Sequence, residues 1–377
     1  MGFYGPRLPV GTRRRISIPT VTKVAEPGGV AGDDQQHEAR GRRVKARFRT
    51  ALFFDMRAPE FGAPAPELYA AALAMTSFAD RLGIDAIGLM EHHGSDDGYL
   101  PSPFVMGGAV AACTRRARIS LGAVVLPLHD PVKIAENIAV LDQLSGGRLE
   151  VTFGAGYVPS EFARFRVSLR DRGRLMDQGI ELILRALRGE RFEADGREIF
   201  VRPLPIQAPE EILLVGGSVA ASARRAASFD LGFAPMHAEL SSLYRSECAR
   251  HGRMPRRILS PAMPLAIHLA EDAESGWKEI RRHALHVVRA YARWAEEEGN
   301  SNSPFKGLLD EHALRESGIF AIWTPDELLA RAENAQEHAT FGFMPLLGGL
   351  PPELGWNSLK LLKKVMPRLR ALQGNER

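Results

Sequence analysis

Short apolar segments alternate with longer amphipathic ones along most of the chain, beginning near residue 48. Residues 51–54 form an apolar run whose length is typical of a buried strand. Residues 66–82 repeat their apolar side chains at helical spacing, and Gly83 follows, as at many helix ends. A second apolar run, 85–90, comes next. The pattern therefore predicts a strand, a helix and another strand.

The alternation continues to the end of the chain. Asp130 and Pro131 are typical of a helix start, and Gly146 is typical of a helix stop. Asp195 and Gly196 favour a tight turn within a hairpin. The predicted hairpin spans 191–201, and further strands are predicted over 119–126, 149–153, 212–215, 231–234, 258–269 and 341–346. Further helices are predicted over 103–116, 131–145, 172–187, 218–228, 241–251 and 273–298, then from 325, and over 356–366 with an end near Pro367.

Strands that alternate with amphipathic helices predict a parallel sheet. About eight strand–helix units after residue 48 favour a closed (β/α)₈ barrel, the TIM barrel, over an open sheet. The polar stretch 299–306 interrupts a late unit without marking a domain boundary. The sequence therefore predicts a single α/β barrel domain over residues 48–377.

Residues 1–47 differ from the rest of the chain in composition. They are rich in Gly, Pro and Arg and show no sustained period, which predicts a disordered, basic N-terminal extension. The chain has 49 basic and 45 acidic residues, of which residues 1–50 hold 11 and 4, leaving 38 basic and 41 acidic residues beyond. Because the excess positive charge belongs to the extension, no nucleic-acid partner is expected. The extension is either an arm for an acidic partner or the product of a misplaced start codon.

The sequence predicts neither a membrane-spanning segment nor a disulfide framework. No apolar run approaches the length of a membrane span or of a signal-peptide core, so no membrane association is expected. Two cysteines, Cys113 and Cys248, do not make a disulfide framework. These features favour a cytoplasmic protein.

The first candidates for chemistry lie at the carboxyl end of the predicted strand 85–90. Glu91, His92 and His93 follow that strand, where barrels carry their active sites. Histidine titrates near neutral pH, so the pair is a candidate for acid–base work, with a structural strand-end pair as the alternative. Adjacent strand residues face opposite sides and cannot share one metal ion as an i,i+4 helical pair would, so no metal is expected. His129 and His237 are further strand-end histidines.

Two glycine-containing segments follow later strands. Gly154 and Gly156 come after a strand, but Pro159 stands where a dinucleotide-binding motif needs a glycine, so Rossmann binding is not favoured. Gly217 and Ser218 lie at the start of a predicted helix, where free backbone N–H groups bind phosphate. The alternatives are a plain turn with a serine cap, or a serine-hydrolase elbow that lacks its second glycine.

In combination, these segments resemble the bacterial luciferase-like flavin monooxygenase family. The resemblance covers roughly residues 48–370 and rests on motifs in one order. They are Glu91-His92-His93, Pro101-Ser102-Pro103, residues 125–132 (VLPLHDPV), residues 141–148 (LDQLSGGR), the glycines at 154 and 156, Gly216-Gly217-Ser218, and residues 351–354 (PPEL).

The resemblance implies that reduced FMN lies across the carboxyl mouth of the barrel. Oxygen would form a flavin hydroperoxide, which oxygenates a small organic substrate. His92 matches the family's active-site histidine beside the flavin ring. The matching cofactor positions are Gly122 and Ala123, joined by a cis peptide against the ring; Gly154, Ala155 and Gly156, beside the ring; and Tyr157, Gly217 and Ser218, toward the phosphate.

The chain departs from the family pattern at one position. Luciferases place an arginine on the flavin phosphate where this chain has Ala155. The departure leaves the deazaflavin coenzyme F-420 as an alternative to FMN, with hydride transfer as the reaction. A flavin-binding barrel without catalysis is another alternative. The resemblance also implies a separate flavin reductase and a homodimer.

Overall fold

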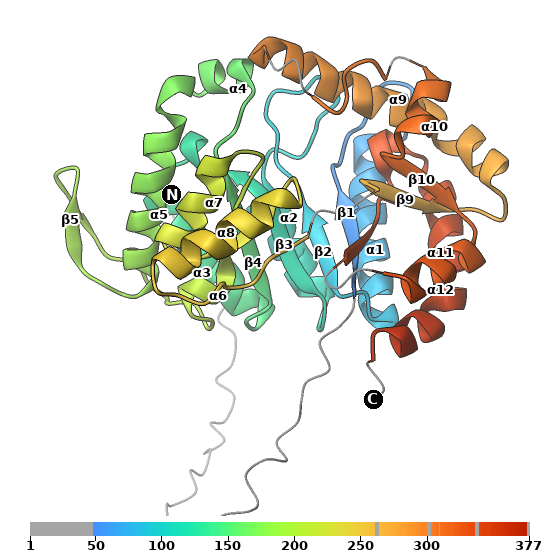
Figure 1. Cartoon of the computed structure of the whole chain (residues 1–377). Coiled ribbons are helices and arrows are strands. Elements are labelled where there is room, and N and C mark those ends of the chain that lie inside the picture. The colour runs from blue at the N-terminus through green and yellow to red at the C-terminus, as the bar shows by residue number, and fades with distance from the viewer. Residues whose placement is uncertain (1–47, 261–263, 300–302, 309, 336–338, 375–377) are drawn as a thin grey trace, which may run out of the picture. The chain divides into compact units, whose positions relative to one another are not determined.

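The computed structural model describes residues 48–260, 264–299, 303–308, 310–335 and 339–374. Its main sheet has nine parallel strands in the order β10-β9-β11-β1-β2-β3-β4-β7-β8, with helices packed outside (Figure 1). The strands are β1 (Phe48–Phe54), β2 (Ala86–Leu89), β3 (Arg118–Val125), β4 (Leu149–Gly154), β7 (Leu213–Gly217), β8 (Gly232–Pro235), β9 (Ala266–Leu269), β10 (Phe320–Trp323) and β11 (Ala339–Phe343). A separate hairpin joins β5 (Phe192–Ala194) to β6 (Arg197–Ile199).

The helices pack around this sheet and close most of its outer surface. They are α1 (Ala65–Leu82), α2 (Pro103–Cys113), α3 (Pro131–Ser145), α4 (Pro159–Arg164), α5 (Arg172–Leu187), α6 (Pro209–Ile212), α7 (Ala220–Ser228), α8 (Glu239–Arg250), α9 (Ala273–Glu298), α10 (Glu311–Ser317), α11 (Pro325–Glu333) and α12 (Pro352–Leu372). Short 3₁₀ turns span Leu126–Leu128, Leu169–Asp171 and Leu347–Gly349. The α9 helix and α4 lie over the carboxyl ends of the strands (Figure 1).

The local signals read from the sequence act as expected at several boundaries. Gly83 takes a left-handed φ of 85° and ends α1. The carboxylate of Asp130 accepts hydrogen bonds from the backbone N–H groups of Val132 and Lys133 and so caps α3. β1 lies inside the sheet, between β2 and β11, and most of its side chains are buried on both faces, as is usual in a parallel sheet covered by helices.

The sheet curls into a barrel through a segment that precedes β9. Phe233 of β8 donates its N–H to Arg257 O and accepts from Leu259 N, each at 2.9 Å. On the other side, Thr340 of β11 donates its hydroxyl to Ser260 O at 3.3 Å. The predicted strand 258–269 is therefore present as a bridge at Ile258 and as β9 farther along. The predicted α/β barrel is confirmed.

Some predicted boundaries were wrong. Pro159 does not prevent a helix from following Gly156, because it occupies the first turn of α4, where its missing N–H costs nothing. Ser218 does not cap α7, whose N-cap is Val219. The α12 helix continues through Pro367 to Leu372. Four of the described helices and strands were not predicted, α4, α6, α10 and β10, and each of them is short. The predicted extension, 1–47, lies outside the described residues.

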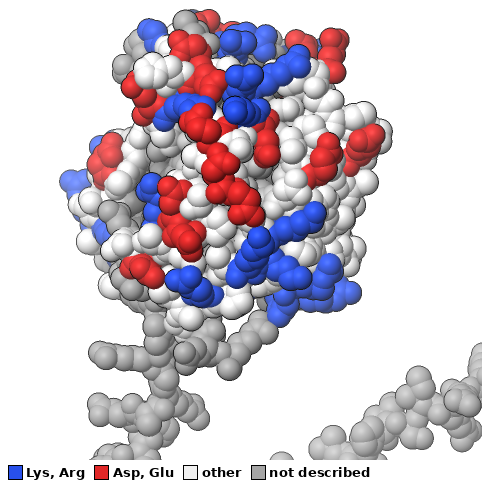
Figure 2. Space-filling model, turned by 90° about the vertical axis from the view of Figure 1, so that its right-hand side faces the viewer, with Lys and Arg blue, Asp and Glu red and all other residues white. Residues whose placement is uncertain are grey.

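The surface of the barrel carries charges of both signs. On the face shown in Figure 2, Lys and Arg side chains alternate with Asp and Glu, so neither sign covers that face alone. Among the helices that the structure describes, none is long and apolar enough to cross a membrane.

Candidate active site

His92 lies just beyond β2 and is held by a carboxylate from α4. Its Nδ1 is 2.8 Å from Glu161 Oε1, and the same oxygen accepts the backbone N–H of His93 at 2.8 Å. Glu161 is 1% exposed and His92 is 9% exposed. Because an ionised carboxylate only accepts, Nδ1 carries the proton of this hydrogen bond. In this tautomer Nε2 is the ring nitrogen that carries the lone pair.

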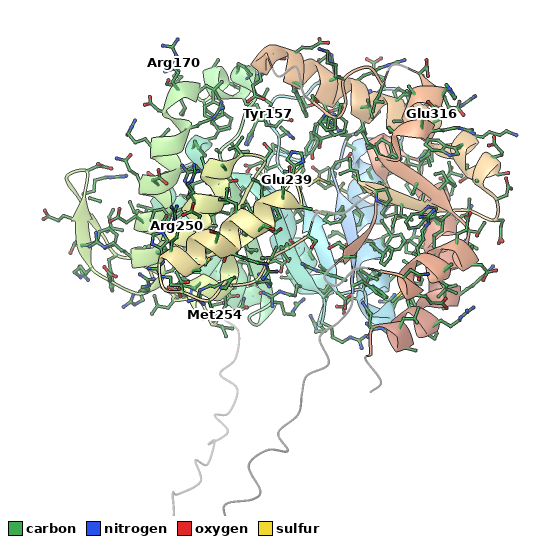
Figure 3. All side chains as sticks on the ribbon, viewed as in Figure 1. Tyr157, Arg170, Glu239, Arg250, Met254 and Glu316 are labelled. Atoms are coloured by element: carbon green, nitrogen blue, oxygen red, sulfur yellow. The ribbon has the colours of Figure 1, made fainter. Side chains whose placement is uncertain are left out.

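Aromatic side chains surround the His92 ring. Trp294 of α9 stacks on it with a centroid distance of 4.2 Å and an interplanar angle of 26°. Tyr99, Tyr157 and Tyr291 meet its edge or face at 4.8, 5.9 and 5.9 Å. Tyr157 lies at the carboxyl end of the barrel, on the side of α4 and α9 (Figure 3). These rings exclude water from one side of the histidine.

A buried guanidinium supports the same aromatic cluster. Arg57 follows β1, is 0% exposed and lies over the rings of Tyr99, Trp294 and Tyr291 at 4.5, 5.1 and 5.5 Å. Its Nη1 forms an ion pair with Asp97, and its Nε is 3.7 Å from Asp55 Oδ2. Burial raises the pKa of Asp55 to about 6, although Arg57 opposes the shift. Arg57 thus joins the end of β1 to the loop after β2.

A separate polar cluster, formed by Glu91, His93 and His129, also lies beyond the end of β2. Glu91 Oε1 is 3.0 Å from His93 Nε2 and 2.6 Å from His129 Nε2. Its Oε2 accepts the N–H of Val125 at 2.7 Å. Burial alone would raise the pKa of Glu91, but hydrogen bonds from His129 and His93 lower it to about 2. His92 and His93 thus belong to different clusters, as their adjacent positions predict.

Small residues line the ends of β3 and β4 beside these clusters. The peptide between Gly122 and Ala123 is cis, as the resemblance implies. A Cβ at Gly122 would make only an ordinary van der Waals contact with Thr152, at 3.8 Å, so this position is not crowded. A Cβ at Gly154 would lie 2.9 Å from that of Ala123, and one at Gly156 would lie 2.6 Å from Val125. The clashes at Gly154 and Gly156 are with neighbouring side chains of the protein, so these two glycines permit close packing. The uncrowded position at Gly122 is the one that suits a flat ring.

The segment Gly216-Gly217-Ser218 lies at the end of β7, the strand next to β4 in the sheet. β7 pairs with β4, so Gly217 at the end of β7 and Ser218 after it lie on the strand adjacent to the one that ends at Gly154. Ser218 is exposed, and among the described residues no hydrogen bond joins its hydroxyl to a histidine or a carboxylate. A serine nucleophile would need such a base, so the hydrolase alternative gains no support.

The predicted site residues therefore converge at the carboxyl ends of four adjacent strands, β2, β3, β4 and β7. His92 and Tyr157 were predicted from the sequence and lie in the aromatic cluster around His92, whereas Glu161, Arg57 and Trp294 were not predicted. A surface cavity of about 460 Å³ lies at the opposite, amino end of β7 and β8. Asp230 and Arg256 in its lining already pair with each other at 2.6 Å, so it is not part of this site.

Comparison with known proteins decides the family. The sequence profile of luciferase-like monooxygenases matches residues 49–333, more than half of the chain. The chain belongs to the luciferase-like monooxygenase family. The 4-hydroxyprotoasukamycin monooxygenase of Streptomyces nodosus subsp. asukaensis is 26% identical, over 78% of this chain and 82% of that relative. Limonene 1,2-monooxygenase of Rhodococcus erythropolis is 26% identical, over 74% of each chain.

Solved structures of luciferase-like proteins share the barrel. Monooxygenase RslO1 from Streptomyces bottropensis matches with a TM-score of 0.70 and 25% identity, covering 85% of this chain and 99% of its own. The oxygenating constituent of 3,6-diketocamphane monooxygenase of Pseudomonas putida, in complex with FMN, has a TM-score of 0.65 at 19% identity, over 86% and 99%. An F-420-dependent secondary alcohol dehydrogenase has a TM-score of 0.63 at 16% identity, over 86% and 99%. Relatives with this fold thus hold flavin-type coenzymes of both kinds.

Proposed function

We propose that the chain is a flavin-dependent monooxygenase that uses reduced FMN and oxygen to oxygenate a small organic substrate. The observation that carries the proposal is His92, held at Nδ1 by Glu161 and covered by Trp294, beside strand ends lined with glycine. A purely binding barrel needs no histidine with its free nitrogen fixed in this way. Bound reduced flavin would supply two electrons, so that one oxygen atom enters the substrate and the other leaves as water.

Different residues of the chain would bind the flavin ring, bind the phosphate and move a proton. Gly122, Ala123 and the residues from Gly154 to Gly156 would leave room for the ring. The backbone N–H of Tyr157, with Gly217 and Ser218, would hold the phosphate. His92 Nε2 would give or take a proton beside the ring, while Trp294 and the neighbouring tyrosines keep water away.

Ala155 leaves the deazaflavin F-420 as an alternative coenzyme to FMN. Its methyl group cannot replace an arginine that would pair with the FMN phosphate, and Ala155 is only half-buried at the end of β4. The second candidate function is therefore hydride transfer with F-420. The monooxygenase names of the relatives at 25–26% identity support FMN over F-420.

Coenzyme titration tests the proposal. Purified protein is titrated with FMN and with F-420, oxidised and reduced, while flavin fluorescence is followed. We expect reduced FMN to bind more tightly than F-420, and we expect turnover only when a separate reductase supplies it. Tighter binding of F-420 would favour hydride transfer, whereas rapid turnover with NAD(P)H and FMN alone would refute the need for a reductase. If neither coenzyme binds, the proposed function is wrong.

We also propose a homodimer, which can be tested at exposed apolar side chains. Val105 of α2 is 77% exposed and Leu144 of α3 is 62% exposed, and these two helices pack together. We place the dimer contact on these two helices. We expect Val105→Glu with Leu144→Glu to convert a dimer to a monomer, measured by light scattering after gel filtration. Met254→Glu changes another exposed apolar residue and should leave the mass unchanged; a monomeric wild type would refute the dimer.

We also propose that the protein is located in the cytoplasm. Cys113 and Cys248 are both free, which suits a reducing compartment such as the cytoplasm.

A further inference from the structure

Glu91, His93 and His129 form a compact cluster that the proposed oxygenation does not use. Glu91 and His93 follow β2, and His129 follows the turn after β3. Their candidate ligand atoms all lie within 4.8 Å of one another. The set contains two imidazoles and one carboxylate, a combination that binds divalent transition metals in many proteins.

We propose that these three side chains bind one divalent transition-metal ion, such as Zn²⁺ or Co²⁺. Two ligands of a tetrahedral ion, each ~2.1 Å from it, lie about 3.4 Å apart. The two histidine nitrogens are 3.0 and 2.6 Å from Glu91 Oε1, so only a small opening of the cluster would admit an ion. The nitrogen ligands favour such metals over Mg²⁺ or Ca²⁺.

The surroundings already orient the carboxylate. The N–H of Val125 holds Glu91 Oε2 at 2.7 Å, which leaves Oε1 for the metal. The Glu91 side chain is 0% exposed, whereas that of His129 is 24% exposed. An ion could therefore enter from the His129 side and keep water as its remaining ligands.

The competing explanation is a hydrogen-bonded cluster in which both Nε2 atoms carry protons. In that arrangement the histidines donate to Glu91 and neither nitrogen has a lone pair for a metal. Both explanations account for the distances, but only one predicts metal affinity. Flavin is not part of the cluster, so flavin-free protein can distinguish these two explanations. The result does not depend on which coenzyme the protein uses.

The experiment is a metal titration of the full chain after removal of any affinity tag. Protein treated with EDTA and then desalted is titrated with ZnSO₄ by calorimetry and with CoCl₂ by absorption spectroscopy. We expect about one ion per chain and a visible Co²⁺ absorption band. His129→Ala should weaken binding at least about tenfold. His312→Ala removes an exposed histidine that also lies near a carboxylate, Glu316, at 3.4 Å, and should leave binding unchanged.

A wild-type measurement removes the dependence on any variant's folding. Proton NMR of the Co²⁺ protein should show paramagnetically shifted signals from two imidazole N–H groups. No binding above that of a protein without the cluster would overturn the proposal. Equal weakening by His312→Ala and His129→Ala, or a Co²⁺ spectrum without imidazole signals, would also overturn it.

Discussion

Replacing His92 with alanine is expected to lower turnover by about 10²–10⁴-fold, the range of a positioned acid–base group. The His92 ring lies against Trp294 and its Nδ1 is fixed by Glu161, so Nε2 is the nitrogen that can exchange a proton with a bound molecule. Flavin affinity should change far less, because the glycines at the ends of β3 and β4 are untouched. Steady-state turnover and flavin titration on the same preparation measure both effects.

Two further variants separate chemistry from structure. Glu161→Gln keeps the size of the side chain but removes the charge that faces Nδ1, so it should shift the pH profile of turnover and lower its maximum. His237→Ala removes an exposed strand-end histidine and should leave turnover intact. The acid–base role would be excluded if His92→Ala kept nearly full turnover, or if turnover and flavin binding fell together.

The fold is the part that the sequence predicts best, because each strand–helix unit carries its own local signals. The bounds of α5 and α9 agree with the prediction residue for residue, since amphipathic spacing and flanking residues define both ends. β10 is missed because four residues after a polar stretch give no period to measure. Pro367 misleads because a proline usually ends a helix, yet packing of the α12 residues around it retains the helix.

The candidate site is only partly readable from the sequence. His92 stands in a recognisable strand-end motif, and the glycines lie at the ends of neighbouring strands. Glu161 is 69 positions from His92, on a short helix that the sequence does not predict. Trp294 lies on a helix whose apolar face is equally well explained as core. Only tertiary structure brings these residues to His92, and no local pattern encodes that arrangement.

Replacing Arg57 with methionine is expected to destabilise the fold by about 3–5 kcal/mol, because it leaves buried carboxylates without their cation. Arg57 is 0% exposed and pairs with Asp97, which also accepts from His286 Nε2 at 2.7 Å. Asp55 would lose the charge that opposes its burial, and its pKa would rise above about 6. Equilibrium urea unfolding, followed by both circular dichroism and tryptophan fluorescence, measures the change.

The pH dependence identifies the cause of this loss. Burial alone would raise the pKa of Asp97, but the hydrogen bond from His286 and the charge of Arg57 hold it well below its ordinary value. A carboxylate with a lowered folded-state pKa stabilises the fold above its unfolded pKa and loses that contribution as the pH falls. The gap between Arg57→Met and wild type should therefore be largest near neutral pH and should narrow in acid.

An exposed ion pair provides the comparison for Arg57. Arg191 pairs with Glu198 on the β5–β6 hairpin, where both side chains are more than half exposed. Arg191→Met should cost no more than about 1 kcal/mol, since solvent screens such pairs. If Arg57→Met costs no more than Arg191→Met at neutral pH, the buried network does not stabilise the strand ends that position His92. A cost that is large but independent of pH would instead assign the effect to lost packing against Tyr99 and Trp294.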